Sequence, residues 1–283
     1  MTIKIVTDST SDLPQNIIQE LDITVVPLFI NIGDEGYLDG VEITRKDFYT
    51  NLPSYEIHPT TGTPGIDAFS QTYTRLASEG ATQILSIHIS KSLSATLGVA
   101  EGSARQFDQI PVVVRDSLQL SAGTGFQVET AARMAQQGKT LDEIIEVLDD
   151  LAARTYVAAG LDTLEYLRRS GRMNAFMTGL GSLLQLKPIL TMDKGLPGSV
   201  RVRTEPKAEA RLVEILEEHS PIERFVLLHA NAADKAEAFR SRIADLIPDG
   251  ETSSMDITPV IGAHLGPGAI GYAIVSKKPK KNK

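Results

Sequence analysis

Short apolar runs alternate with helix-like repeats over the first half of the chain. Runs of strand length cover residues 3–6, 23–32, 84–89 and 111–115. Between them, Ile66, Phe69 and Tyr73 recur at the spacing of one helix face, and further helices are expected from about residue 95 and up to residue 138. The alternation predicts parallel βαβ units, so we expect residues 1–157 to form an α/β domain with a doubly wound, mainly parallel sheet.

A capping box supports one of these helices. Thr140 is followed three residues later by Glu143, and an apolar repeat continues to Leu151. The threonine side chain can accept a hydrogen bond from the amide of the third helical residue, while the glutamate reaches back. The pair predicts a helix that begins after Thr140.

The pattern changes after residue 157. A short helix is expected over 163–169, and residues 188–192 and 200–203 are expected to pair as antiparallel strands around a turn at 194–195. Further helices are predicted at 206–219 and 233–247, and further strands at 224–230, 254–261 and 269–275. Residues 158–283 are therefore expected to form a second, α+β domain.

Composition narrows the range of functions. The 283-residue chain has a formal charge of −8 with 28 Lys and Arg residues, so we expect no nucleic-acid binding, which needs a basic face. It has no cysteine, no apolar run of the ~20 residues that a membrane span needs, and no charged leader before an apolar stretch. We therefore expect a cytoplasmic protein without stable membrane insertion.

Several familiar motifs lack their structural context. Residues 266–271 match G-x-G-x-x-G, but a strand follows them where a dinucleotide site needs a helix, so a tight turn between two strands is expected there. The sequence around Ser94 lacks the G-x-S-x-G elbow of α/β hydrolases, and the five histidines show no metal-ligand spacing. We therefore predict no cofactor and no metal.

Two clusters of hydroxyl residues remain, at 60–64 and 90–96, each placed before a predicted helix. They are either ordinary N-caps or an anion pocket, because helix N-termini supply amide donors and a partial positive charge. A carboxylate or a phosphate would fit such a pocket. No strong base lies beside the clusters in the sequence, which favours binding over catalysis.

The whole chain resembles the DegV family of bacterial fatty-acid-binding proteins. The resemblance rests on segments at 6–14 (VTDSTSDLP), 60–69 (TTGTPGIDAF), 89–100 (ISKSLSATLGVA), 113–125 (VVRDSLQLSAGTG), 163–173 (TLEYLRRSGRM), 183–195 (LLQLKPILTMDKG) and 260–271 (VIGAHLGPGAIG). It implies a two-domain protein with an acyl chain, such as palmitate, buried between the domains. It also implies a separate ATP-dependent fatty acid kinase that phosphorylates the presented carboxylate for phospholipid synthesis, with the protein itself not an enzyme.

The resemblance implies residue roles as well. The carboxylate is expected at Thr61, Ser94 and His264, with Gly62 and Ala95 beside them, and Arg172 is expected to contact the head group or the kinase. The expected acyl-chain lining comprises Leu180, Leu183, Leu184, Leu186, Ile189 and Leu190.

This chain departs from the family pattern at three places. Gly62-Thr63 stands where the family has Ser-Gln, Ala95 replaces the glycine after the serine, and Ser170 replaces a glycine two residues before Arg172. Thr61, Ser94 and His264 are retained.

Two alternatives from other classes stay open on the sequence. One is an acyl hydrolase with Ser94 as nucleophile and His264 as base, for which Asp8 is the candidate orienting group. The other is a small-molecule sensor.

Overall fold

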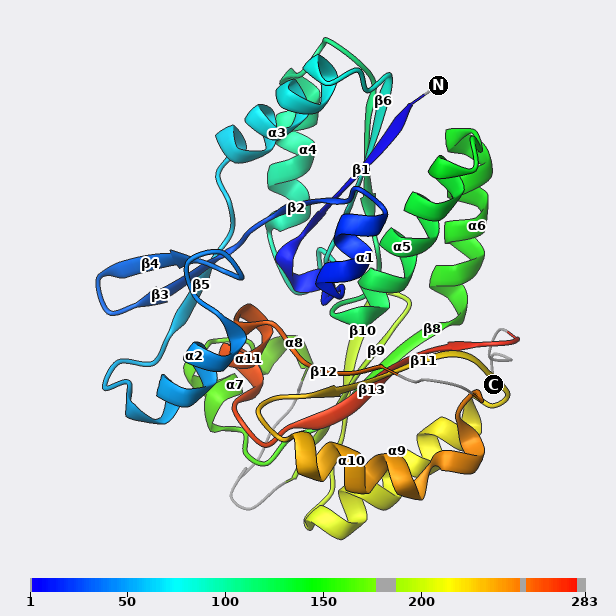
Figure 1. Ribbon diagram of the computed structural model, residues 1–283. Helices are drawn as coiled ribbons and strands as arrows, with labels where there is room; N and C mark the ends of the chain where they lie inside the picture. The colour runs from blue at the N-terminus through cyan, green and yellow to red at the C-terminus, as the bar shows by residue number, and fades with distance from the viewer. Residues whose placement is uncertain (1, 177–186, 250–252, 279–283) are drawn as a thin grey trace.

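The computed structural model describes residues 2–176, 187–249 and 253–278. Its N-terminal domain is built on a parallel sheet of order β2-β1-β6-β7, seen in the upper half of Figure 1. The strands are β1 (Ile3–Asp8), β2 (Thr24–Val26), β6 (Gln83–His88) and β7 (Val112–Asp116). All neighbouring strands in this sheet run parallel, as the sequence predicts.

Helices cover both faces of this sheet because its strands are apolar on both sides. Val6 and Ile84 pack with α3 (Ile66–Ser78) and α4 (Thr96–Gln106). Ile5 and Leu85 point the other way, into the core that includes α5 (Ala122–Gln136) and α6 (Leu141–Arg154). The doubly wound prediction is confirmed, and so is the capping box that begins α6 at Thr140 and Glu143.

A small antiparallel sheet extends from this domain in place of a single long second strand. The apolar run 23–32 is divided between β2 and β3 (Phe29–Ile32), and β3 pairs with β4 (Glu35–Leu38) and β5 (Thr60–Gly62). The hydroxyl cluster at 60–64 precedes a helix, as predicted, but Gly65 is the N-cap of α3, so the alternative that this cluster caps the helix is wrong. The remaining helices of this part are η1 (Ser9–Ser11), α1 (Gln15–Glu20), α2 (Arg45–Asn51) and η2 (Leu52–Ser54).

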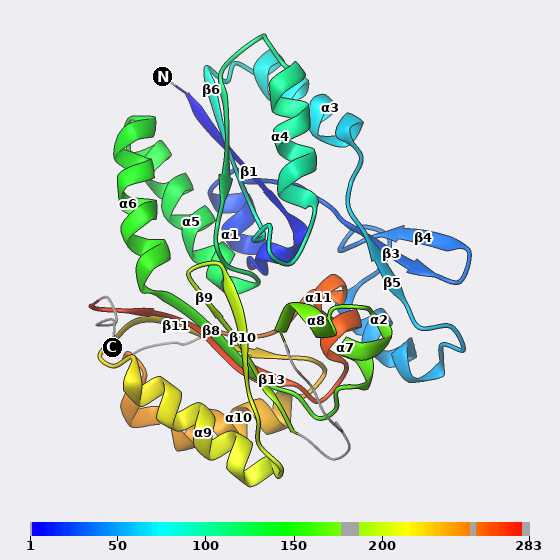
Figure 2. The ribbon, with the colours of Figure 1, turned by 180° about the vertical axis from the view of Figure 1, so that it is seen from behind.

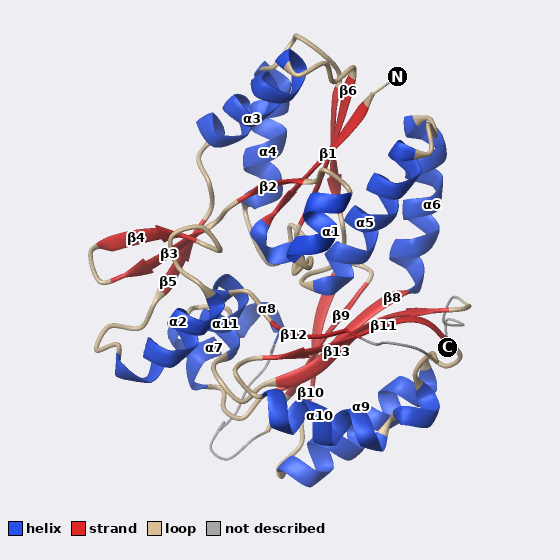
Figure 3. Ribbon diagram, viewed as in Figure 1, coloured by secondary structure: helices blue, strands red, loops and turns tan. Residues whose placement is uncertain are grey.

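The C-terminal domain holds a larger, mixed sheet of order β10-β9-β8-β13-β11-β12. Its strands are β8 (Thr155–Gly160), β9 (Ile189–Asp193), β10 (Leu196–Val200), β11 (Ile222–His229), β12 (Ser253–Asp256) and β13 (Ile270–Ser276). Helices α9 (Glu205–Glu218) and α10 (Ala233–Arg242) lie beneath it in Figure 3, as an α+β domain requires. The sheet begins at Thr155, so the predicted division between residues 157 and 158 falls inside β8.

Alternation along the strands of the larger sheet divides its side chains between two layers. Ala158 and Leu227 face the layer of α9 and α10, whereas Val157 and Leu228 face the N-terminal domain. On that second side they join one continuous core with residues of α5 such as Phe126. The two domains therefore share a buried face.

Three short helices fill the region where the domains meet on the side of the small sheet. They are α7 (Glu165–Arg169), α8 (Met173–Phe176) and α11 (Pro259–Leu265), and Figure 2 shows them beside α2 from behind. The predicted strand 254–261 was wrong in its second half, because β12 ends at Asp256 and Pro259 opens α11. Consequently the turn at 266–268 joins a helix to a strand rather than two strands.

Two smaller predictions also need correction. The strand expected at 200–203 is β10, which starts directly after the Lys194-Gly195 turn and ends at Val200. The helix expected over 233–247 ends at Arg242, and a separate turn, η3 (Ala244–Leu246), follows it.

Candidate ligand site between the domains

Five of the six predicted head-group residues, Gly62 among them, line one cavity between the domains. Thr61 comes from β5, Ser94 from the turn before α4, His264 from α11, and Arg172 from the segment between α7 and α8. The space between the walls of this cavity, called the head cavity below, is about 610 Å³. Four segments far apart in the sequence thus converge on one site.

His264 and Thr61 form a neutral hydrogen-bonded pair. The Nε2 atom of His264 lies 3.1 Å from Oγ1 of Thr61, and its Nδ1 atom is buried without a hydrogen-bond partner among the described residues. Burial, and then the nearby charges of Arg172 and His58, lower the pKa of His264 to about 3. The imidazole is therefore uncharged at neutral pH and acts as a hydrogen-bonding group.

Ser94 lies at the N-terminal end of α4, which follows the carboxyl end of β6. Its Oγ accepts a hydrogen bond from the amide of Thr96 at 3.2 Å and lies 2.8 Å from the Thr96 hydroxyl. Ala95 is the N-cap of α4 and is exposed, so it does not line the head cavity, whereas Gly62 does. The turn thus presents a hydroxyl beside the positive end of a helix dipole, as the sequence predicts.

Arg172 supplies positive charge to the head cavity. Its Nε donates to the carbonyl of Leu93 at 3.3 Å, and its guanidinium also reaches the carbonyl of Ser170 at 3.5 Å. The first contact ties Arg172 to the turn that carries Ser94. Because Ser170 accepts through its backbone, its replacement of a family glycine leaves this contact in place.

The groups proposed for hydrolysis do not assemble. Asp8 accepts from Nδ1 of His88 at 2.9 Å, and Nε2 of His88 lies 2.7 Å from the Ser86 hydroxyl. All three side chains are fully buried. Among the described residues, no hydrogen bond joins Ser94 to His264, and a histidine with a pKa of about 3 is a weak base. Asp8 instead caps the turn at Thr10 and holds the amide of Ile89.

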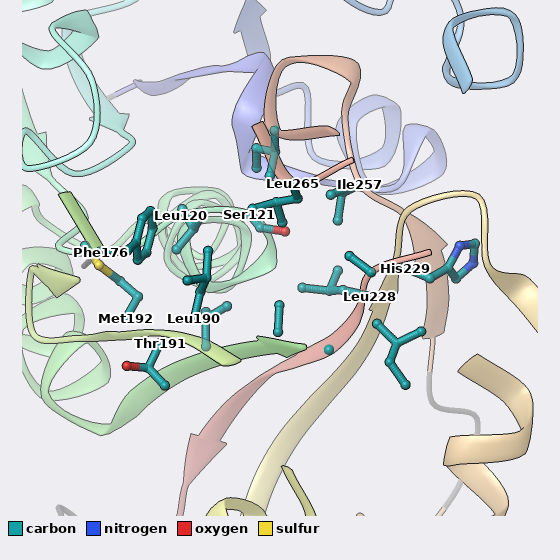
Figure 4. Close-up of a pocket in the computed structure, with 16 residues that line it drawn as sticks. Leu120, Ser121, Phe176, Leu190, Thr191, Met192, Leu228, His229, Ile257 and Leu265 are labelled. Carbon is teal, nitrogen blue, oxygen red and sulfur yellow. The ribbon is translucent and has the colours of Figure 1, made fainter. Parts of the chain in front are cut away.

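A second, apolar hollow lies next to the head cavity over the C-terminal sheet. Leu120, Phe176, Ile261 and Leu265 line both hollows, so the two adjoin each other. This hollow, called the tail cavity below, has a wall in which aliphatic side chains dominate. Figure 4 shows Leu190 and Leu228 pointing into it, while the ring of His229 turns away.

The predicted lining of the tail is placed only in part. Leu190 lines the tail cavity, whereas Ile189 points to the opposite face of β9 and joins the core that includes α9. Leu180, Leu183, Leu184 and Leu186 lie outside the described residues. Sequence reasoning missed Ile261 and Leu265, although their spacing after Pro259 is that of one helix face.

No group of three or more acidic, histidine or cysteine side chains that could hold a metal ion occurs in the described ranges. In the same ranges, no helix is long and apolar enough to cross a membrane.

The fold and the site define a class: a two-domain α/β protein with two adjoining cavities between its domains, one carrying hydroxyl, histidine and arginine side chains and the other apolar. The sequence matches the DegV family over residues 2–277. The chain belongs to the DegV family, which confirms the resemblance drawn from its sequence segments.

Individual relatives agree over almost their whole length. A DegV domain-containing protein of Halalkalibacterium halodurans is 37% identical over 276 residues, covering 96% of this chain and 97% of that protein. The structure described as fatty acid binding of a DegV family protein from Thermus thermophilus has a TM-score of 0.88 at 34% identity, with 98% and 100% of the chains covered. DegV of Bacillus subtilis, described as a fatty acid binding protein, has a TM-score of 0.89 at 29% identity, with 98% and 100% covered.

Proposed function

We propose that this protein binds a long-chain fatty acid, such as palmitate, with its carboxylate in the head cavity and its acyl chain in the tail cavity. It then presents the carboxylate to a separate ATP-dependent fatty acid kinase and performs no catalysis itself. The observation that carries the proposal is that the cavity holding Thr61, Ser94 and His264 adjoins an apolar one, with four side chains in the walls of both. Similar proteins described as fatty-acid-binding support it.

The two cavities would contribute to binding in different ways. Each buried methylene group contributes about 0.8 kcal/mol, so a chain of ~14 methylenes supplies roughly 10 kcal/mol before the costs of association. The head cavity must compensate the carboxylate for its lost hydration, because an unpaired buried charge is expensive. Arg172, the hydroxyls of Thr61 and Ser94 and the N-terminus of α4 are suited to that task.

The first test is mass spectrometry of the purified protein, native and after solvent extraction. We expect a stoichiometric long-chain fatty acid that is lost from a Thr61→Ala/Ser94→Ala double variant, because both hydroxyls hold the head group. Thr74→Ala/Ser78→Ala is the matched control, since it removes the same two residue types from the exposed surface of α3. An empty wild-type protein that also takes up no added fatty acid would refute the proposal.

The carrier role has a separate test at Arg172. With a fatty acid kinase and ATP, loaded wild-type protein is expected to yield acyl phosphate, and Arg172→Ala to yield at least tenfold less, the effect of about 1.4 kcal/mol. Arg168→Ala is the control, because Arg168 is exposed and pairs with Glu165 in α7, the helix just before Arg172. Normal acyl phosphate formation by Arg172→Ala would remove Arg172 from the presenting site.

A further inference from the structure

Within the described chain, both hydrogen bonds of the Ser94 hydroxyl are made with one residue, Thr96. The amide of Thr96 donates to Oγ of Ser94 at 3.2 Å, and the Thr96 hydroxyl lies 2.8 Å from the same atom. Ser94 is half-buried and lines the head cavity, whereas Thr96 is fully buried and does not line it. Any effect of the Thr96 hydroxyl on a bound head group therefore passes through Ser94.

The burial of Thr96 decides which of the two hydroxyls is the donor. Among the described residues, Ser94 is the one hydrogen-bond partner of the Thr96 hydroxyl. If Ser94 donated its proton to Thr96, the Thr96 proton would be buried without an acceptor, which is costly. If Thr96 donates instead, its own proton is satisfied and the Ser94 proton stays available. The Thr96 hydroxyl is therefore the donor of this bond.

Accepting two hydrogen bonds leaves Ser94 as a donor toward the head cavity. A serine hydroxyl has two lone pairs and one proton, and the amide and hydroxyl of Thr96 occupy both lone pairs. The remaining proton is directed away from Thr96, and the space that Ser94 lines is the head cavity. A carboxylate only accepts hydrogen bonds, so its oxygens match this proton.

Thr10 shows that a hydroxyl in the wall of the head cavity is not by itself a donor to a ligand. The Thr10 hydroxyl donates to the fully buried carboxylate of Asp8, which also accepts from the Thr10 amide at 3.0 Å. The Thr10 proton is thus already used. The neighbour that each hydroxyl bonds to, Asp8 or Thr96, decides whether its proton is free for a ligand.

We infer that Thr96 is a positioning residue for the head group: by donating to Ser94, it directs the Ser94 proton to a bound carboxylate. The inference rests on the proposed function. A hydroxyl that accepts a hydrogen bond is also a stronger donor, because hydrogen bonds in a chain polarise one another. Arg172 and His264 reach the same cavity from other elements, so the carboxylate does not depend on the end of α4 alone.

The experiment is a double-mutant cycle that measures the dissociation constant for palmitate. Thr96→Val removes the hydroxyl and nearly keeps the shape of the side chain, and we expect it to weaken binding roughly fivefold, the effect of one hydrogen bond. In a Ser94→Ala background, the same substitution is expected to change the dissociation constant by less than about twofold, because the group that Thr96 positions is gone.

Three further variants accompany the cycle. Thr96→Ser keeps the hydroxyl and should bind palmitate as wild type does. Thr96→Ala removes the hydroxyl with a smaller side chain and repeats the measurement independently of valine. Thr140→Val is the control, since it removes a hydroxyl from the exposed start of α6 and should leave palmitate binding unchanged.

The outcomes separate the inference from the proposed function. If wild type binds palmitate and folded Thr96→Val or Thr96→Ala binds it equally well, the inference is overturned and fatty acid binding stands. Equal losses in the wild-type and Ser94→Ala backgrounds overturn it as well, since Thr96 would then support the fold rather than Ser94. A wild-type protein that binds no palmitate overturns both.

Discussion

Asp39 shows how a single buried carboxyl can govern the pH response of this protein. Its side chain is almost fully buried and accepts a hydrogen bond from the Thr258 hydroxyl. Burial raises the pKa of Asp39 to about 6, although Ser9 and Thr258 donate to it. Asp39 is therefore easier to protonate in the folded than in the unfolded protein, where aspartate has a pKa of about 3.9.

Replacing Asp39 by asparagine should stabilise the protein at neutral pH. Because the folded-state pKa is the higher one, the contribution of Asp39 to the free energy of unfolding is lost as pH rises from about 4 to about 6. We expect Asp39→Asn to avoid this loss. Its free energy of unfolding at pH 7 should exceed that of wild type by up to about 3 kcal/mol, which corresponds to the difference between a pKa of about 6 and one of about 3.9. Urea unfolding at several pH values measures this free energy.

The exposed Asp108→Asn serves as the control, since its loop position carries no comparable burial. A difference between wild type and Asp39→Asn that stays constant from pH 4 to pH 7 would show that Asp39 titrates normally in the folded protein.

At the scale of elements, α11 decides whether the head cavity forms. This helix carries His264 and Ile261, and α2 fixes it at one contact. An alanine Cβ at Gly262 would lie 2.3 Å from the hydroxyl oxygen of Tyr49, which is itself buried and donates to the carbonyl of Ile257. Only glycine allows the two helices to approach so closely.

Gly262→Ala should therefore push α11 away from α2. We expect it to lower the free energy of unfolding by roughly 1–3 kcal/mol, as overpacking does, and to weaken fatty acid binding because His264 moves. Calorimetry and a fatty acid titration measure the two effects.

Gly98→Ala is the matched control, because Gly98 lies in α4 with open space around it and should gain up to about 1 kcal/mol from alanine. A Gly262→Ala protein as stable as Gly98→Ala would show that the contact with Tyr49 does not hold α11.

The sequence predicts helices and strands correctly where an apolar repeat runs over many residues, and the prediction fails where the repeat covers only a few. The βαβ series and the helix after Thr140 carry clear repeats. By contrast, β5 has three residues, and only its pairing with β3, distant in the chain, makes it a strand. The run at 254–261 has too few apolar residues to show whether they repeat with the period of a helix or of a strand. Pro259 is its one signal of a helix start.

The site is predictable to a similar degree. Hydroxyl clusters and family segments identify Thr61, Ser94, His264 and Arg172, which the structure brings together. The tail cavity is not predictable in this way, because lining and core residues have the same composition. Ile189 and Leu190 are adjacent in sequence and equally apolar. Only the pleat of β9 directs Leu190 into the cavity and Ile189 into the core.

At the scale of the whole molecule, the shared core couples the two domains. Residues of the N-terminal sheet such as Leu85 and residues of the C-terminal sheet such as Met192 belong to one buried cluster. Separating the domains would expose this cluster and both cavities. We therefore expect a single cooperative unfolding transition rather than one for each domain.

A bound fatty acid should strengthen this coupling. At a free concentration of one hundred times its dissociation constant, a ligand that binds only the folded state adds about 2.7 kcal/mol. Calorimetry with increasing palmitate should show one transition whose midpoint rises by several degrees. Two transitions, with only one shifted by palmitate, would show that the domains unfold independently and that the acid binds to one of them alone.

The head cavity takes its residues from both halves of the chain, which has a practical consequence. Thr61 and Ser94 come from the first half, and Arg172 and His264 from the second. A chain cut at the exposed turn after Gly138 gives two fragments, neither of which holds a whole site. Their reassembly would bury the same core, and a fatty acid touching both would draw them together. Fused to the halves of a split reporter, such fragments would turn free fatty acid concentration into a light signal.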